Sequence, residues 1–298
     1  MIARTYFISR ISMNISISEI EHLKAWVDRQ EILSDNITCA PVRALSATLD
    51  RNDVEPKNGD VLPELWHWLY FLPHQRQSEI GADGHAKRGG FLPPVPLPRR
   101  MWAGGRLQWH QPIKLGDEVK RVSTIKSVTH KSGRTGDLVF VLVHHEIFTP
   151  NGLAITEEHD IVYRPLAAPG KTPPPPTVAT KDSLWTKHIY PDDVLLFRYS
   201  ALTFNGHRIH YDRKYVTEVE GYPGLIVHGP LIATQLVDLF RQNMPNKSLS
   251  KFEFRALRPT FDIHDFQIKG TPNPDGTISL WALDHEGWLT MQATATLL

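Results

Sequence analysis

The stretch PGLIVHGPLIATQLVDLFRQNMP, residues 223–245, is the strongest helix candidate in the second half of the chain. Its apolar positions run almost without a break from Leu225 to Phe240, so a helix here would be buried on most of its sides. Pro230 suits the first helical turn, where a missing N–H costs nothing. The amides of His228 and Gly229 would then lie at the helix N-terminus, where the dipole favours negative charge. The sequence therefore predicts a central helix enclosed by a sheet.

Alternating polar and apolar residues predict antiparallel strands in both halves of the chain. Residues 116–148 have the pattern of a hairpin with its turn at Lys131 to Gly136, and residues 151–164 follow as a third strand. Residues 252–298 repeat this pattern of hairpin and final strand after the predicted helix. Each half is therefore expected to lay one long helix on a curved antiparallel sheet. In the first half the helix candidate is residues 16–29, with Ser18 as its N-cap.

A proline-rich segment separates the two halves. Residues 167–181, AAPGKTPPPPTVATK, contain four consecutive prolines, which favour an extended polyproline conformation and exclude helix and central strand. We expect a linker here, with one half at residues 1–166 and the other at residues 182–298. Residues 60–100 are rich in proline and glycine and are expected to form loops.

Composition limits the class of protein and its partners. The 298 residues are 41% hydrophobic and 22% charged, which is typical of a globular protein with a sizeable core. The formal net charge is only +1, so neither nucleic acid nor an anionic membrane is an expected partner. Cys39 is the single cysteine, which excludes an intrachain disulfide and fits a reducing compartment. With no apolar run of membrane-spanning length, the protein is expected to be cytoplasmic.

The segment FNGHRIHYD, residues 204–212, gathers two histidines, an arginine, an asparagine and an aspartate within nine positions. By residue type alone it is a catalytic loop, a metal site or a polar turn. His207 and His210 have a spacing compatible with metal ligation, but no cysteine or carboxylate cluster completes a recognisable ligand set. No metal is therefore expected, and without a further signal His210 is most simply a structural histidine.

A further signal comes from longer strings. The segments FRYSALTFNGHRIHYD (197–212) and EGYPGLIVHGPL (220–231) resemble the hydroxyacyl-thioester dehydratase branch of the MaoC-like hot-dog superfamily. Residues 66–73, 83–105 and 133–146 resemble the dehydratase domain of mesaconyl-, 3-methylfumaryl- and itaconyl-CoA hydratases. The resemblance implies an α+β double hot-dog fold, in which two antiparallel sheets each wrap around a central helix. It also implies that the catalytic groups lie in the C-terminal half.

The resemblance also suggests roles for individual residues. Hydration of an enoyl thioester needs a held water, a group that takes its proton, a donor at the α-carbon, and amides that stabilise the enolate oxygen. Histidine ordinarily titrates near neutral pH, so His210 is the expected acid–base group, and the amide of Gly229 is expected to meet the enolate. Related hydratases have an aspartate five residues before the catalytic histidine, where this chain has Asn205. Asparagine is not a base, so Asn205 is expected to orient the water. Whether Asp212 or Tyr199 shares the acid–base work is left open.

Three arginines are candidates for binding the substrate, namely Arg208, Arg100 and Arg99. A guanidinium group suits the phosphates of CoA or a carboxylate on the acyl group, and a dicarboxylic acyl group would need one of the three. Each arginine can instead be an ordinary surface or ion-paired residue. Tyr199 and His228 complete the expected substrate-binding set.

The function expected from these residues and this resemblance is reversible hydration of a short, branched, unsaturated dicarboxylic acyl-CoA. Itaconyl-CoA and mesaconyl-C4-CoA are the favoured substrates, each giving a citramalyl-CoA. The alternatives are an (R)-3-hydroxyacyl-thioester dehydratase on a carrier protein, a hot-dog thioesterase, and a non-catalytic acyl-CoA-binding module. No cofactor is expected apart from the CoA of the substrate. A homo-oligomer is compatible with the sequence, which does not fix the oligomeric state.

Overall fold

The computed structural model describes residues 15–133, 136–165, 175–179 and 182–298. Its strands are β1 (Gln30–Asn36), β2 (Arg99–Trp109), β3 (Glu118–Gly133), β4 (Gly136–Thr149), β5 (Gly152–Arg164), β6 (Trp185–Ile189), β7 (Leu249–Ala256), β8 (Phe266–Pro272), β9 (Thr277–Leu283) and β10 (Leu289–Leu297). Its helices are α1 (Ile17–Lys24), α2 (Cys39–Thr48), α3 (Asp193–Leu202) and α4 (Gly229–Asn243), with shorter turns η1 (Trp66–Leu69), η2 (Gln77–Glu79), η3 (Arg208–His210) and η4 (Tyr215–Val219). The architecture is α+β, as expected.

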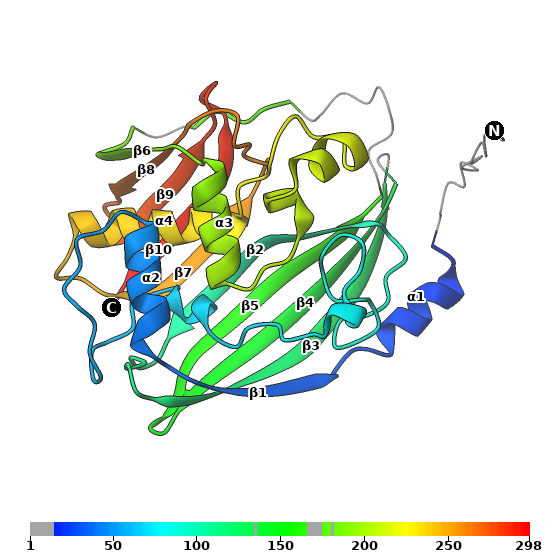
Figure 1. Ribbon diagram of the computed structural model, residues 1–298, viewed down its shortest axis with the longest axis horizontal. Helices are drawn as coiled ribbons and strands as arrows, with labels where there is room; N and C mark the ends of the chain where they lie inside the picture. The colour runs from blue at the N-terminus through cyan, green and yellow to red at the C-terminus, as the bar shows by residue number, and fades with distance from the viewer. Residues whose placement is uncertain (1–14, 134–135, 166–174, 180–181) are drawn as a thin grey trace.

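All ten strands form one antiparallel sheet in the order β1-β3-β4-β5-β2-β7-β10-β9-β8-β6 (Figure 1). The alternation that predicted the strands is the alternation of burial, because every second residue of β4 from Asp137 to Thr149 is buried. The predicted turn between β4 and β5 is confirmed, since β4 ends at Thr149 and β5 begins at Gly152.

The two halves meet where β2 pairs with β7, so the sheet is continuous from one half to the other. The loop predicted up to residue 100 ends earlier, because β2 begins at Arg99. Glycines permit this junction. A Cβ on Gly104 would lie 2.6 Å from the carbonyl oxygen of Phe254, and one on Gly105 would lie 2.9 Å from the Phe254 ring. A side chain at either glycine would therefore push β7 away from β2.

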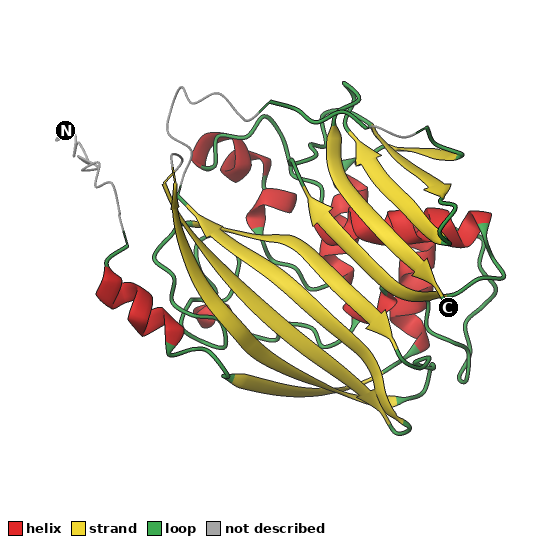
Figure 2. Cartoon of the chain, turned by 180° about the vertical axis from the view of Figure 1, so that it is seen from behind, coloured by secondary structure: helices red, strands yellow, loops and turns green. Residues whose placement is uncertain are grey.

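The predicted central helix is confirmed as α4. It begins after the N-cap His228, carries Pro230 in its first turn, and is buried along its whole middle, residues 231–240. It packs on β6, β8 and β9. Seen from behind, the helices α2, α3 and α4 lie on one face of the sheet and leave the other face bare (Figure 2). The N-terminus of α4 is thereby fixed inside the molecule, beside the segment 204–212.

The first half does not repeat this arrangement, contrary to expectation. Its helix candidate forms only α1, which lies at the outer edge of the sheet near β3 (Figure 1). The N-cap of α1 is Ser16 rather than Ser18, and it forms a capping box with Glu19. In place of a long helix, the irregular chain of residues 65–92 faces the inner side of the first-half strands and lines a large cavity there together with them.

Most of the predicted linker, residues 167–174 and 180–181, lies outside the described residues. Within the part that is described, Val178 forms a β-bridge with Trp288. None of the helices in the described ranges has both the length and the apolar character needed to cross a membrane.

Candidate active site

A cavity of about 1190 Å³ lies between the two halves. Both halves contribute to its wall. Its lining includes His85, Arg100, Trp102 and Tyr163 from the first half, and Tyr199, Ser200, Asn205, Gly206 and Pro230 from the second. The segment 204–212, the helix α3 that precedes it and the start of α4 thus meet the cavity at one place.

The segment 204–212 begins with a tight turn that presents Asn205 to the cavity. Phe204 has a positive φ of 48°, and the backbone N–H of Asn205 donates to the carbonyl of Ser200 at 2.8 Å. The side-chain oxygen of Asn205 accepts the backbone N–H of His207 at 3.0 Å. This bond fixes the amide plane in a manner typical of an Asx turn, and it leaves the side-chain NH₂ group for a ligand in the cavity.

His210 is held in one tautomer. It is 8% exposed, and its Nδ1 lies 2.7 Å from the carbonyl oxygen of Ile226. A carbonyl only accepts, so Nδ1 carries the hydrogen and Nε2 keeps a lone pair. Burial lowers the pKa of His210 to about 4, against a smaller opposing effect of the Ile226 carbonyl. His210 is therefore a neutral potential base at pH 7. It does not itself line the cavity, whereas its loop neighbours Asn205 and Gly206 do.

His228 and Gly229 lie where the sequence predicted them, at the N-terminus of α4. The His228 side chain is fully buried, and its Nε2 lies 2.8 Å from Oγ of Ser200. Burial and the neighbouring His210 lower the pKa of His228 well below its usual range. Gly229 is the first residue of α4 and precedes Pro230, which lines the cavity. The dipole of a fifteen-residue helix thus points toward this end of the cavity.

The two residues left open as a second acid–base group lie in different surroundings. Tyr199 lines the cavity from α3, and burial raises the pKa of its hydroxyl. It therefore stays protonated and can only donate or accept a hydrogen bond at neutral pH. Asp212 accepts from the backbone N–H of Tyr215 at 3.0 Å and pairs with Arg208 at 2.7 Å. These bonds occupy its carboxylate in holding the loop.

The three candidate arginines also differ. Arg208 pairs with Asp212 and lies over the ring of Tyr215, 4.1 Å from its centroid. Arg99 pairs with Glu220 at 2.9 Å. Arg100 lines the cavity and has no carboxylate partner within the described part of the chain. Of the three, Arg100 is the one placed to meet a ligand.

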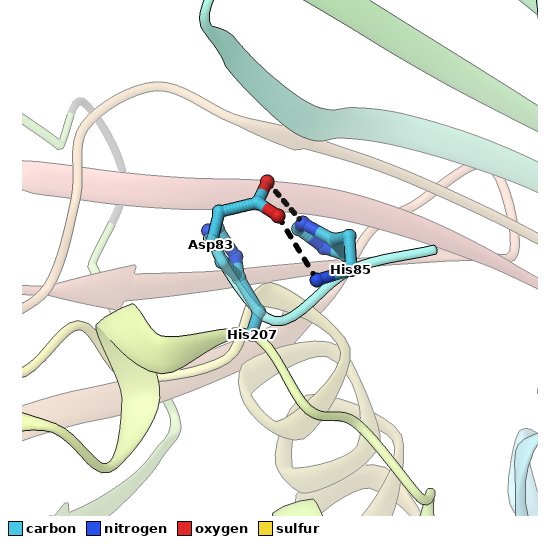
Figure 3. Close-up of side chains that lie close together, drawn as sticks. All are labelled: Asp83, His85 and His207. Atoms are coloured by element: carbon cyan, nitrogen blue, oxygen red, sulfur yellow. Dashed lines mark hydrogen bonds and ion pairs between the residues drawn. The ribbon is translucent and has the colours of Figure 1, made fainter. Parts of the chain in front are cut away.

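The sequence did not single out Asp83 and His85, which the structure brings against the segment 204–212. Nδ1 of His85 lies 3.0 Å from Oδ2 of Asp83, and the His85 backbone N–H donates to Oδ1 at 3.0 Å (Figure 3). The ring of His85 lies on that of His207, with 3.9 Å between centroids. The only signal in the sequence was the string DGH inside a longer resemblance.

Asp83, His85 and His207 are close enough to share a metal ion, since one ligand atom from each lies within 4.8 Å of the others. His207 therefore gains a carboxylate neighbour that the sequence did not reveal, whereas His210 is not in this group. Both oxygens of Asp83 already accept hydrogen bonds from His85, and we assign no metal here.

The sequence is similar to that of known dehydratases and hydratases. The family model described as hydroxyacyl-thioester dehydratase type 2 matches residues 65–262, more than half of the chain. The chain belongs to this family. A mesaconyl-C(4)-CoA hydratase of Chloroflexus aurantiacus is 45% identical over 273 residues, which are 92% of this chain and 97% of the relative. The matched residues include the segments on which the resemblance was based. The resemblance is thereby confirmed.

Solved structures confirm the fold of this dehydratase-family chain as a double hot-dog. A MaoC-like dehydratase superposes with a TM-score of 0.67 over 92% of this chain and 98% of its own, at 16% identity. A Mycobacterium tuberculosis protein described as having a double hotdog fold gives a TM-score of 0.54 over 91% and 97% of the two chains, at 11% identity. The chain is an enzyme of the thioester hydratase and dehydratase class.

A second polar group lines the cavity of this dehydratase-family enzyme and was also missed. Glu157, 3% exposed, lies 2.9 Å from Nε2 of His67 and 2.6 Å from Nε2 of His159, and accepts Nε1–H of Trp68 at 2.8 Å. Burial raises the pKa of Glu157, but the opposing effect of the two histidines is larger. The pKa is therefore well below its usual range, and the carboxylate stays ionised. The group fixes the inner face of β5 and the turn η1 against each other.

Proposed function

We propose that this enzyme adds water reversibly to a short, branched, unsaturated dicarboxylic acyl-CoA. Itaconyl-CoA and mesaconyl-C4-CoA are the substrates we favour, and citramalyl-CoA is the product. The identity to a mesaconyl-C(4)-CoA hydratase supports the hydration of a CoA thioester. The enzyme needs no cofactor beyond the CoA of its substrate, and we expect it in the cytoplasm.

The observation that carries the choice of a dicarboxylic substrate is that Arg100 and Asn205 line the same cavity. Hydration of mesaconyl-C4-CoA places the new hydroxyl on the carbon that carries the free carboxylate. A site for this substrate therefore needs a cation near the residue that positions water, because a carboxylate enters a buried site only when it is paired. Arg100 meets this need. Its charge lowers the pKa values of His85 and His207, though less than burial does, so it acts on the same end of the cavity.

In this proposal the catalytic groups come from the second half, residues 182–298. Asn205 orients a water in the cavity, and Nε2 of His210 takes one of its protons as the oxygen bonds to the β-carbon. For mesaconyl-C4-CoA, whose double bond is conjugated with the thioester, the electrons of the Cα=Cβ bond move to the thioester oxygen, where the amide of Gly229 and the dipole of α4 stabilise the enolate. Itaconyl-CoA has its double bond between the β-carbon and the methylene group, so it enters this step only after the double bond has shifted to Cα=Cβ. A proton then reaches the α-carbon and completes the hydration. Tyr199 and His228 shape the binding site, and the bonds of Arg208 and Arg99 hold the loops around it.

The test is incubation of the purified protein with three esters, itaconyl-CoA, mesaconyl-C4-CoA (which is also called 3-methylfumaryl-CoA) and crotonyl-CoA, with products identified by mass. We expect a gain of one water on itaconyl-CoA or mesaconyl-C4-CoA and little on crotonyl-CoA. Release of free CoA thiol without a hydrated product would instead indicate a thioesterase. Tight binding of the esters without any product would overturn the proposal.

A second candidate is an (R)-3-hydroxyacyl-thioester dehydratase acting on a carrier protein. The family description and the cavity of about 1190 Å³, which is larger than a small branched acyl group needs, favour it. Under this alternative, linear enoyl thioesters of increasing chain length should be hydrated faster than itaconyl-CoA. A preference for the dicarboxylic esters would exclude it.

A further inference from the structure

We propose that His85, held by Asp83, is a second catalytic group of this site, contributed by the first half of the chain. In this role it protonates the α-carbon of the acyl group. The inference rests on the proposed hydration and names the donor that the second half does not supply. Three features carry it: the seating of residues 81–86 on the segment 204–212, the orientation of the His85 ring, and the contact of that ring with His207, which lies next to His210.

The turn 81–86 is built to lie on the segment 204–212. The backbone N–H of Arg208 donates to the carbonyl of Asp83 at 2.9 Å, and Nη1 of Arg208 donates to the carbonyl of Ala82 at 2.9 Å. Gly84 has a φ of +89°, and a Cβ there would lie 1.7 Å from the carbonyl oxygen of Gly206. Only a glycine allows so close an approach of two backbones. The contact between the halves is therefore fixed at the backbone level.

This seating aims the imidazole of His85 at the cavity. A carboxylate only accepts, so the 3.0 Å contact between His85 Nδ1 and Asp83 Oδ2 places the hydrogen on Nδ1. The other ring nitrogen, Nε2, keeps its lone pair for a ligand or a proton. The His85 side chain is 22% exposed and lines the cavity that Asn205 also lines. Asp83 stabilises the imidazolium form and fixes the ring, as carboxylates do beside catalytic histidines.

Three polar groups near the segment 204–212 are poorly suited to carry this proton. Asn205 cannot titrate, and the carboxylate of Asp212 is occupied by Arg208 and by the backbone of Tyr215. The hydroxyl of Tyr199 is deeply buried and accepts no proton to pass on at neutral pH. Beside this segment, the imidazoles of His85, His207 and His210 are the better carriers. His207 lies between the two that matter, with its ring centroid 3.9 Å from that of His85 and 5.5 Å from that of His210.

The step balances without a co-reactant. Nε2 of His210 takes a proton from water as the water oxygen bonds to the β-carbon and the Cα=Cβ electrons move to the thioester oxygen. In this proposal His207 accepts the proton from His210 and passes it to His85, and its ring lies between the two. His85 then gives it to the α-carbon as the enolate electrons return to form the Cα–H bond. One proton leaves water, one proton reaches carbon, and all three histidines are neutral again.

The experiment compares His85→Gln and Asp83→Asn with His264→Gln, which alters an exposed histidine away from the cavity. The wild type is first assayed on the three CoA esters, and one with a Cα=Cβ bond that it hydrates, mesaconyl-C4-CoA or crotonyl-CoA, is used throughout. The readouts are kcat, KM, and exchange of the α-hydrogen of the hydroxyacyl-CoA product in D₂O, followed by mass. The rate of reverse dehydration is also measured with product deuterated at the α-carbon.

We expect His85→Gln to lower kcat by roughly 10²- to 10⁴-fold, the span for a lost acid–base group, with little change in KM. Exchange of the α-hydrogen should fall in proportion, and the isotope effect of the α-deuterated product should rise, because breaking this bond becomes limiting. Asp83→Asn keeps a hydrogen-bond acceptor but loses the charge, so it should lower kcat by roughly tenfold. It should also shift toward lower pH the limb of the pH–rate profile that reports on His85, because burial lowers the pKa of His85 and the charge of Asp83 opposes that lowering.

Two results would overturn the inference while leaving the proposed function intact: unchanged kcat and α-exchange in His85→Gln, or a loss of activity with an unchanged isotope effect. Loss of activity on chelation, restored by a divalent metal, would also overturn it by assigning Asp83, His85 and His207 to a metal. If His85→Gln does not fold, Asp83→Asn decides by the same readouts. A wild type inactive on all three esters would overturn the proposed function, and this inference with it.

Discussion

The imidazole rings of His210 and His228 are stacked, with centroids 3.7 Å apart and planes inclined by 19°. The two rings come from different elements, η3 and the N-cap of α4, and both are buried. Burial lowers the pKa of His210 to about 4 and that of His228 well below its usual range. Two stacked imidazolium ions would repel each other in a site of low dielectric. The stack therefore requires the neutral forms of both rings, so its stability depends on pH.

This stack predicts that the fold loses stability on mild acidification. The folded pKa of His210 lies below its ordinary value of 6.5, so between about pH 6.5 and 4 the unfolded chain binds a proton that the folded chain does not. Stability therefore rises with pH in this window and falls as the pH drops through it. His210 alone accounts for about 1.4 kcal/mol per pH unit there. Thermal melts at pH 7.5, 6.5 and 5.5 measure the effect.

The control for this prediction compares the loss of a buried histidine with the loss of an exposed one. His210→Gln removes one buried titrating group and should flatten the dependence of melting temperature on pH. Replacement of the exposed His264 by Gln should leave it unchanged. Equal slopes in all three proteins would mean that the buried imidazoles do not set the acid stability.

Substrate choice should depend on Arg100. Arg100→Met should lower kcat/KM for itaconyl- or mesaconyl-C4-CoA by about 30-fold or more, because it leaves a buried carboxylate unpaired. Crotonyl-CoA has no free carboxylate and should be affected far less. The matched control is Arg198→Met, since Arg198 is exposed on α3 and does not line the cavity. An equal loss on both types of substrate would assign Arg100 to CoA binding or to folding.

The contact between the halves should be sensitive to one methyl group. Gly84→Ala places a Cβ against the carbonyl of Gly206 in addition to straining a positive φ, so it should dislodge the turn 81–86. The control is Gly59→Ala. Gly59 has a nearly equal φ of +92° but nothing within 4 Å of its Cβ position, so it should cost only the backbone strain, about 1–2 kcal/mol. We expect Gly84→Ala to lower the melting temperature further and to reduce kcat, whereas equal effects would show that the contact is unimportant.

The parts of the fold that the sequence predicted have a clear local period. α4 is mostly apolar and buried from Leu231 to Phe240, and β4 alternates residue by residue, so each signal lies within one segment. The strand β2 was missed because it contains Gly104 and Gly105, residues that are rare in strand interiors. Those glycines are explained only by Phe254, which lies about 150 positions away in the sequence.

The same division holds for the site. Asn205, His210 and Gly229 belong to segments whose pattern marks them, and the structure brings these segments to one end of the cavity. Asp83 and His85 reach the site through contacts such as that of Arg208 with Ala82, which are 126 positions apart. No local pattern specifies such a contact. Likewise, the sequence alone does not distinguish Arg100 from Arg208 as the arginine that binds substrate. The structure distinguishes them, because Arg208 is paired with Asp212.

The last prediction divides the work between Asn205 and His210. If His210 is the acid–base group that meets water, His210→Ala should lower turnover by roughly 10²- to 10⁴-fold. If Asn205 only positions the water, Asn205→Asp should retain more activity than Asn205→Ala, because it keeps a polar group that can hold the water and restores the carboxylate that related hydratases have. The assay is turnover on the preferred CoA ester, with circular dichroism and thermal melts as the control for folding.

The structure adds one condition to this comparison. Oδ1 of Asn205 accepts the backbone N–H of His207 at 3.0 Å, and aspartate can keep that bond whereas alanine cannot. Part of the loss in Asn205→Ala will therefore come from a loosened turn, which a lower melting temperature would reveal. Asn205→Asp keeps the turn and changes only the group that faces the water, so its rate reports on chemistry alone. Near-normal turnover in His210→Ala with an intact fold would remove His210 from the mechanism and leave His85 or His207 as the base; loss of folding would mean that the stack with His228 is structural.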